Sequence, residues 1–545
     1  MSRDRTPSDR ADVCVIGAGP AGSLLAQRLA EAGNRVVVLE AGPRFDRQRR
    51  TDQMERALRP AYDPRSVWEM GGPRDAFVST GDRDYPLNHT RVKGVGGSTL
   101  YWQGMVVRLH ERDFEVRTRE GWGTDWPIEY EDLRPYYAEA ERLLGVAGAS
   151  DNPFAPAREQ PHPMPAFEPS HSDAILAEAC QSLGITTHSA PNARNSEPFD
   201  DRSACVGYGT CQPVCPSGAK YDATSTLEAA EAAGARVVDR APVQRLEHDE
   251  AGDHVTAAVY ATPEGETYRQ RARQFVLAAG GVETPRLLLL SRSAQYPDGL
   301  ANSSGLVGRY FTEHLFAGTG GRIDQETRQH HVGFQTTESH QFYDDPAAGT
   351  SQGVPAAEVD GKDLLAIKLE FLNTAGPSPV DLALSDGGWG NDLRETISDA
   401  YGNSLAVGAL IEQPPRREHA VGLDTTRTDD HDNPVPEIHW GIDDRTRRTI
   451  RRANAIQERI LAELGAEITW QVGPENTGPA SHHMGTTRMG TDPESSVVDS
   501  ALRTHDLANL WLAGSSVFPT GGAMNPTLTI AALTLRAADH LVDRL

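Results

Sequence analysis

Residues 12–40 contain the feature that most constrains the fold of this chain. A short apolar run at 12–16 leads into the turn Gly17-Ala18-Gly19-Pro20-Ala21-Gly22, and leucines with helical spacing follow up to Gly33. A second apolar run at 35–39 ends at Glu40. This order of strand, glycine turn, helix and strand predicts the start of a Rossmann-like α/β domain. In that unit the glycines let the backbone approach a pyrophosphate at a helix N-terminus.

The acid after the second run strengthens the prediction of a nucleotide site. A carboxylate at the end of this strand can accept hydrogen bonds from ribose hydroxyls, and Glu40 stands eighteen residues after Gly22. A merely structural glycine turn is the alternative. We predict that a dinucleotide contacts Gly17, Gly19, Gly22, Glu40 and Ala41. The sequence Glu40-Ala41-Gly42 resembles flavoproteins, which favours FAD over NAD.

Length and charge limit the remaining possibilities. A chain of 545 residues is too long for one hydrophobic core and predicts two or three domains. The net charge of −24 argues against a nucleic-acid partner, because a polyanion would be repelled. The basic residues are nearly all arginine, and the only lysines are Lys93, Lys220, Lys362 and Lys368. Such a surface suits concentrated salt, so a halophilic source is one hypothesis and a high-GC genome the ordinary alternative.

No targeting or membrane signal is readable in the sequence. Residues 1–10 are polar, and no run of eighteen apolar residues occurs in the chain. We therefore expect no integral membrane span and a cytoplasmic location, with export or membrane association only through a partner.

The patterns predict an α/β fold with a second, α+β domain. Strand-like or glycine-turn segments at 236–238, 274–281 and 510–514, and a final helix at 527–545, extend the first domain. We assign 10–150, 200–312 and 470–545 to a discontinuous FAD-binding domain that carries the cysteine-rich loop 203–220. Residues 151–199 and 313–469 form the predicted substrate domain.

The substrate domain is predicted to contain an antiparallel sheet. Strand-like patterns occur at 318–323, 364–372, 404–412 and 437–440, and a helical pattern covers 443–464. Residues 324–362 and 374–403 are rich in Gly, Pro and Asp, so we expect loops over the site there.

Three blocks of sequence together identify a family. They are the glycine turn at 17–22, the segment Gly96-Gly97-Ser98, and the stretch 482–539 with its His482-His483 pair and Met524-Asn525-Pro526-Thr527. The chain resembles the glucose-methanol-choline (GMC) flavin oxidoreductases, most of all the FAD subunits of sugar and sugar-acid dehydrogenases and the pyranose oxidases. The match is thin between about 320 and 430, where substrate contacts are expected.

The resemblance implies a catalytic pair and a set of cofactor contacts. Oxidising an alcohol requires a base for the hydroxyl proton while the carbon gives a hydride to the flavin. His482 matches the family's catalytic histidine, and Asn525 matches its partner, whose amide can donate to the developing alkoxide. One of His482 and His483 is expected to point away and pack. Further cofactor contacts are expected at Gly96, Gly97, Ser98, Val243, Ala279, Gly280, Ala513, Gly514, Asn525, Pro526 and Thr527.

Two features bear on the cofactors. Some pyranose oxidases attach FAD through a histidine, but Tyr101 or Trp102 stands near that position here, so non-covalent FAD is expected. Cys205, Cys211 and Cys215 lie within eleven residues, and similar loops in related FAD subunits carry a three-iron (3Fe-4S) cluster. Val206 replaces a cysteine of that loop. An iron–sulfur cluster, a disulfide with one free thiol, and zinc or reduced thiols therefore all stay open. Cys14 and Cys180 are expected in the core.

The predicted function is FAD-dependent oxidation of an alcohol group of a sugar, sugar acid or polyol to a carbonyl. Electrons are expected to pass to a non-oxygen acceptor, with an electron-transfer subunit (a cytochrome or a small chaperone-like subunit) as possible partner. An oxygen-using, pyranose-oxidase-like enzyme is the alternative within the class. A flavin-bound lyase or a non-redox binder is the alternative from another class.

Overall fold

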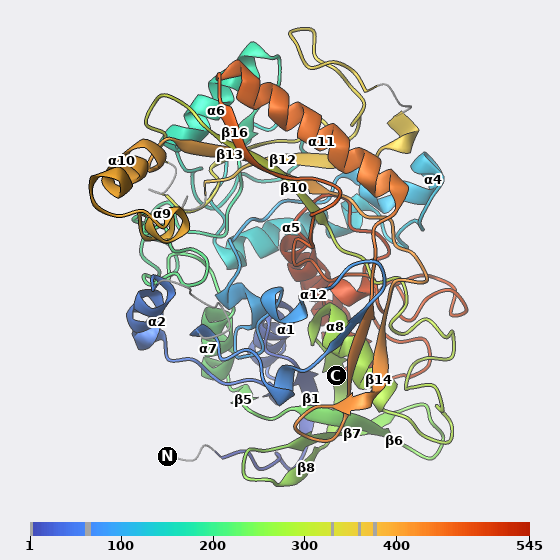
Figure 1. Cartoon of the computed structure of the whole chain (residues 1–545). Coiled ribbons are helices and arrows are strands. Elements are labelled where there is room, and N and C mark those ends of the chain that lie inside the picture. The colour runs from blue at the N-terminus through green and yellow to red at the C-terminus, as the bar shows by residue number, and fades with distance from the viewer. Residues whose placement is uncertain (1–3, 60–66, 329–331, 358–360, 374–378) are drawn as a thin grey trace.

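The computed structural model describes residues 4–59, 67–328, 332–357, 361–373 and 379–545. A five-stranded parallel sheet forms the centre of the first domain (Figure 1). Its strand order is β17 (Leu510–Leu512), β9 (Ala272–Leu277), β1 (Ala11–Ile16), β2 (Val36–Leu39) and β5 (Arg236–Val238). Segments that are far apart in the chain thus meet in one sheet, which confirms the Rossmann-like prediction.

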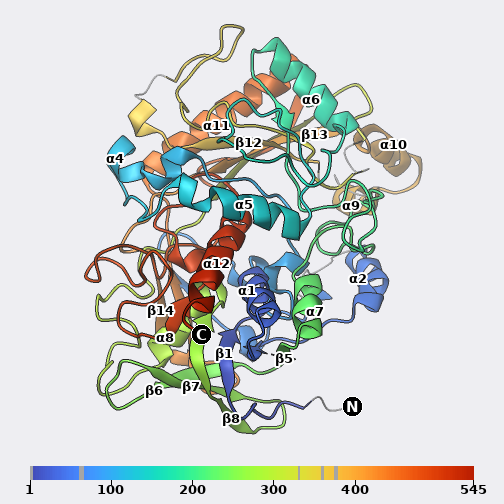
Figure 2. The same cartoon turned by 180° about the vertical axis from the view of Figure 1, so that it is seen from behind.

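Helices α1 (Pro20–Glu31), α7 (Thr224–Ala232) and α12 (Thr527–Val542) lie together on one side of this sheet (Figure 2). Helix α1 begins at Pro20, whose fixed φ suits the first helical position. Gly22 lies on the side of α1 that meets the turn, where an added Cβ would stand 2.0 Å from the carbonyl oxygen of Gly17. The third glycine of the motif therefore serves the packing of helix against turn.

A six-stranded antiparallel sheet forms the centre of the second half of the molecule. Its order is β16 (Glu467–Val472), β10 (Leu315–Arg322), β13 (Ser404–Ile411), β12 (Ile367–Phe371), β11 (Thr337–Ser339) and β4 (His188–Ser189). The long helix α11 (Asp444–Glu463) packs across one face, with α6 (His171–Ser182) beside it (Figure 1). The predicted antiparallel sheet is confirmed.

The strand predicted at 437–440 belongs elsewhere. It is part of β15 (Pro434–His439), which lies between β14 (Ala420–Thr428) and β3 (Val78–Thr80) in a separate three-stranded sheet against α8 (Gly280–Leu290). Strands β6 (Val243–His248), β7 (Val255–Ala261) and β8 (Thr267–Gln270) form another small sheet. A strand-like sequence pattern indicates that a segment pairs with another strand, but it does not identify which strand.

The expected loops were only partly correct. Residues 374–378 lie outside the described residues, but α9 (Pro379–Asp386) and α10 (Gly390–Ala400) follow them, and β11 falls within the other loop. The i, i+4 pair Leu393 and Ile397 was the helical signal, hidden among Gly and Asp. The remaining elements are α2 (Arg50–Ala57), α4 (Val116–Glu120), α5 (Tyr130–Leu144) and the short 3-10 helices Arg47–Arg49, Pro73–Asp75, Leu87–His89, Gly97–Leu100, Glu111–Phe114, Gly361–Asp363 and Ser515–Val517.

Helix α5 lies against α12 (Figure 2), and their buried side chains join the largest hydrophobic cluster, which also includes Phe275 of β9. Cys14 and Cys180 are both fully buried, in β1 and α6, as predicted. Within the described residues, no helix combines the length and apolar character needed to cross a bilayer.

Candidate functional site

A cavity of about 700 Å³ is lined by segments from both halves of the molecule. The turn after β1 and the start of α12 line it from one side, and Phe316, Glu370 and Leu410 of the antiparallel sheet line it from the other. Most of the sequence-predicted residues line this cavity: Gly17, Gly19, Glu40, Ala41, Gly97, Ser98, Val243, Ala279, Gly280, His482, Gly514, Asn525, Pro526 and Thr527. Gly22, Gly96 and Ala513 are not part of its lining.

Two glycine turns meet at the wall of the cavity. An added Cβ on Gly97 would lie 2.8 Å from Cα of Gly19, and one on Gly17 would lie 2.5 Å from the carbonyl oxygen of Ala278. Gly17 also has φ +106°, a conformation that favours glycine. The backbone segments of this wall therefore pack too closely for side chains at these positions. A glycine turn at the N-terminus of a helix, here α1, is an arrangement that phosphate recognition uses.

Glu40 is held at the far end of this wall. Its two carboxylate oxygens accept the backbone N–H of Ala18 and of Gly42, each at 2.8 Å. Burial raises the pKa of Glu40 above its ordinary value, although these two N–H groups and the Lys93 ammonium oppose the shift. Each oxygen keeps a second lone pair, so the carboxylate can also accept from ribose hydroxyls.

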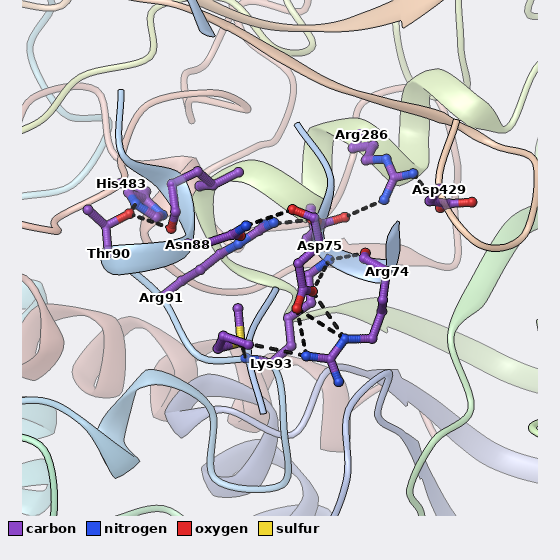
Figure 3. A network of polar contacts seen from close by, with 12 residues as sticks. Arg74, Asp75, Asn88, Thr90, Arg91, Lys93, Arg286, Asp429 and His483 are labelled. Carbon is purple, nitrogen blue, oxygen red and sulfur yellow. Dashed lines mark hydrogen bonds and ion pairs between the residues drawn. The ribbon is translucent and has the colours of Figure 1, made fainter. Parts of the chain in front are cut away.

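A network of buried ions forms another part of the cavity wall (Figure 3). Glu283 pairs with Arg91 at 2.6 Å, Lys93 at 3.0 Å and Arg286 at 3.1 Å. These cations outweigh burial and hold the pKa of Glu283 well below its ordinary value. The Nε and Nη2 atoms of Arg91 are buried without a hydrogen-bond partner. Unpaired donors of a cation in the same cavity as a glycine turn at a helix N-terminus fit an anionic, phosphate-bearing cofactor such as FAD.

The tautomer of His482 follows from a chain of hydrogen bonds. The carbonyl oxygen of Gly521 can only accept, so His314 donates its Nε2–H to it at 3.2 Å. Burial lowers the pKa of His314 to about 4, so its Nδ1 carries a lone pair at neutral pH. The 2.9 Å contact between the two Nδ1 atoms is therefore donated by His482. This leaves Nε2 of His482 unprotonated in a residue that lines the cavity.

Burial and neighbouring charges keep His482 in this neutral form. Burial lowers the pKa of His482 well below its ordinary value, and His314, Lys368 and His483 add to the shift. Its backbone N–H donates to Glu313 at 2.7 Å, and Glu313 also accepts the Tyr85 hydroxyl. Burial raises the pKa of Glu313 to about 8. The imidazole is thus held in place and ready to accept a proton.

His483 has a different role in the structure. The hydroxyl of Thr90 donates to the carbonyl of Leu87, so His483 donates its Nε2–H to Thr90 at 2.9 Å (Figure 3). Its ring packs edge-on against Tyr85. Since Nε2 of His483 is used as a donor, the geometry favours His482 as the base of the pair.

Asn525 contacts a buried lysine that the sequence reasoning missed. Lys368 of β12 is fully buried and donates to Oδ1 of Asn525 at 2.7 Å. The signal that could have identified it is compositional, because the chain has 53 Lys and Arg residues but only four lysines. His314 and Glu313 were missed as well, since a single acid–histidine pair carries no periodic signal.

The cysteine-rich loop lies next to the segment 96–104, to which Trp102 belongs. Among the described residues, which include all five cysteines, none forms a disulfide. The ammonium of Lys220 is buried between the two segments, where it donates to the carbonyls of Trp102 at 2.5 Å and Cys211 at 2.8 Å. Burial raises the pKa of Cys205. Burial also opposes ionisation of Cys215, but the amide and ammonium of Lys220 outweigh it and lower its pKa.

Family models match three stretches of the chain. The model described as "GMC oxidoreductase" matches residues 79–316 and 415–534, and the model described as "FAD binding domain" matches residues 10–58. No comparison supports an iron–sulfur cluster at the three cysteines.

Two curated relatives match almost the whole chain. One is the fructose dehydrogenase large subunit of Gluconobacter japonicus, 34% identical over 98% of this chain and 98% of the relative. Another is the 2-methyl-1,2-propanediol dehydrogenase of Mycolicibacterium austroafricanum, 32% identical over 99% of this chain and 96% of the relative. Among solved structures, formate oxidase of Aspergillus oryzae superposes with a TM-score of 0.68 at 17% identity over 99% of each chain, a likeness of fold alone.

Proposed function

Because the chain belongs to the GMC oxidoreductase family, an FAD-dependent family that acts on alcohol groups, we propose that it oxidises a hydroxyl of a sugar or polyol to a carbonyl. The observation that carries this proposal is the fixed tautomer of His482, whose unprotonated Nε2 belongs to a residue of the cavity wall. The bare glycine turns, Glu40 and Arg91 fit FAD, which when bound accepts the hydride from the substrate carbon.

The chain's own residues supply the proton chemistry. Nε2 of His482 accepts the hydroxyl proton, and the positive charge that forms is stabilised through Nδ1–H donated to His314. The amide of Asn525 donates to the substrate oxygen as negative charge develops on it. Segments from both halves of the molecule line the cavity in which this chemistry would take place. We propose that the cofactor contacts are those predicted from the sequence, with three exceptions. Gly22, Gly96 and Ala513 are not part of the cavity lining and instead support the cavity wall.

A separate electron-transfer partner fits the proposed dehydrogenase function. The relative from Gluconobacter is named a large subunit and matches the present chain over nearly its full length. We propose that this chain likewise passes electrons to a partner protein rather than to dioxygen. Reduced enzyme should then be reoxidised faster by a soluble quinone or artificial dye than by air. Hydrogen peroxide formed in proportion to substrate would instead indicate an oxidase.

The test of the function is flavin bleaching without oxygen. Wild-type protein mixed with a panel of sugars and polyols should lose its flavin absorbance with at least one of them. His482→Ala should retain FAD, judged by the flavin-to-protein absorbance ratio, and reduce it at least roughly 10²-fold more slowly. Between about pH 7 and about pH 6, where Glu313 is protonated because burial raises its pKa to about 8, the wild-type rate should stay constant, since burial keeps the pKa of His482 well below its ordinary value. Near-native bleaching by His482→Ala would refute the assignment.

The cysteine loop requires its own measurement. Iron and acid-labile sulfide in proportion to the purified chain would establish the iron–sulfur cluster that is one of the alternatives left open by the sequence. Their absence, with Cys205, Cys211 and Cys215 all titrating as thiols, would assign the loop a structural role. Release of the flavin on acid precipitation tests the prediction that FAD is not covalently bound.

A further inference from the structure

Lys368 lies where it can control the orientation of the Asn525 amide. Its ammonium group donates to Oδ1 of Asn525 at 2.7 Å and to Glu338 at 3.5 Å, and it forms an ion pair with Glu370 at 2.7 Å that lacks hydrogen-bond geometry. The side chain is fully buried, so no water competes for these donors at its surface. We propose that Lys368 is a positioning residue of the oxidation, which holds Asn525 with its NH₂ group toward the substrate oxygen.

Elementary hydrogen-bond chemistry fixes the direction of the amide. An ammonium can only donate, so the atom of Asn525 that meets Lys368 must be the carbonyl oxygen. The NH₂ group lies on the other branch of the amide, in a residue that lines the cavity. Without the lysine, either end of the amide could face the substrate, and a carbonyl oxygen there would repel a developing alkoxide.

The antiparallel sheet fixes the lysine in turn. Lys368 and Glu370 are two residues apart on β12 and share a face of the sheet, and Glu338 stands opposite Glu370 on β11. Glu338 also accepts from Gln335 and from His340, each at 3.2 Å. Burial alone would raise the pKa of Glu338, but Lys368 and His340 lower it to about 2, so the carboxylate is charged. The lysine is therefore anchored by the charges of Glu338 and Glu370 as well as by its hydrogen bond to Asn525.

A lysine suits this position better than the arginine that the chain uses elsewhere. The ammonium is a compact charge that fits between one amide oxygen and two carboxylates, whereas a guanidinium is a planar fork. A second effect follows from the charge, which disfavours a proton on His482. His482 is faced by His314, His483, Lys368 and the carboxyl of Glu313.

The test is a double-mutant cycle on the FAD-loaded enzyme, and it rests on the proposed function. Lys368→Met should lower the rate of anaerobic flavin reduction roughly 10²-fold, with a much smaller change in substrate affinity. In an Asn525→Ala background the same substitution should change the rate less than about threefold, because the lysine acts through the amide. A lysine that only neutralises Glu338 and Glu370 would instead slow both backgrounds equally.

A measurement apart from turnover accompanies the cycle. The pKa of His482, followed by NMR with isotope-labelled histidine, should rise in Lys368→Met because a neighbouring positive charge is lost. Arg452→Met is the matched control, since Arg452 is also a buried cation and donates only to the carbonyls of Pro346, Ala348 and Pro355 outside the cavity. It should lower the unfolding temperature and leave the reduction rate and the pKa of His482 unchanged.

Further outcomes distinguish a wrong role for Lys368 from a wrong proposed function. If Lys368→Met does not retain FAD, Lys368→Gln replaces it, because an amide still offers a donor to the two glutamates. Because the Gln amide can also donate to Oδ1 of Asn525, a partly restored rate in Lys368→Gln agrees with the positioning role. A native rate in Lys368→Met, or equal losses in both backgrounds for either variant, would overturn it. Failure of the wild type to bleach with any alcohol would instead overturn the proposed function.

Discussion

The tautomer of one histidine decides the acid–base chemistry of this site. His482 can act as a base because His314 accepts its Nδ1–H, and His314 is itself fixed by a backbone carbonyl. A carbonyl cannot change its hydrogen-bonding role, so the chain of donors has one direction only. The adjacent His483 has the same side chain but donates its Nε2–H to the hydroxyl of Thr90.

Replacing His314 by phenylalanine tests this chain of donors. His314→Phe keeps most of the buried volume but removes the acceptor for Nδ1–H of His482, so both tautomers become accessible. We expect flavin reduction to slow roughly 10²-fold, the lower end of a general base's contribution, with FAD retained. His419→Phe is the control, because burial also lowers the pKa of His419 to about 4 but its side chain is not part of the cavity wall. Equal rates in both variants would contradict the proposed relay.

At the level of elements, sequence patterns predicted local structure better than contacts. The turn at 17–22 and the strands on either side of it were predicted because glycines and β-branched runs report local backbone requirements. Helices α9 and α10 were missed because Gly and Asp masked a short apolar pair. The roles of Lys368 and His314 depend on contacts with Asn525 and His482, more than 150 positions away, and no local pattern encodes such pairing.

Substitution of two different glycines in the turn at 17–22 should affect protein stability in one case and cofactor binding in the other. Gly22→Ala places a methyl group 2.0 Å from the oxygen of Gly17 and should destabilise the protein by about 1–3 kcal/mol. Gly19→Ala meets its nearest reported neighbour, Cα of Gly97, at 3.9 Å, so stability should change by less than about 0.5 kcal/mol. Its methyl group at the cavity wall should nevertheless weaken FAD binding. Thermal unfolding of FAD-free protein and a fluorescence titration with FAD measure the two effects, and a stability loss in Gly19→Ala would refute the distinction.

The whole molecule carries far more acid than base. With 77 acidic and 53 basic side chains, self-repulsion opposes the compact state, and salt screens it over a distance that shrinks from about 10 Å at 0.1 M to about 3 Å at 1 M. Salt also weakens exposed ion pairs such as Arg35–Asp12, but each contributes only about 0–1 kcal/mol. Repulsion summed over the surface should therefore dominate.

A salt series tests this balance. The unfolding temperature should rise by more than about 2 °C between about 0.1 M and about 2 M potassium chloride, which for a chain of this size corresponds to roughly 1 kcal/mol or more. Sucrose at matched osmolality controls for effects of the solute that do not involve charge. An unfolding temperature that is highest at low salt would contradict a halophilic protein.

The burial of the lysines has a consequence for handling the protein. Of the lysines whose side chains the structure describes, Lys220 and Lys368 are buried and Lys93 exposes 13% of its side chain. Amine-directed cross-linkers, fluorophores and electrode coatings therefore have few exposed amines to modify. Lys220 and Lys368 can react only after the core around them has unfolded locally. Attachment through surface carboxylates, which are abundant, leaves both ammonium groups intact. The rate of amine labelling would then measure the rate of local unfolding around the cavity.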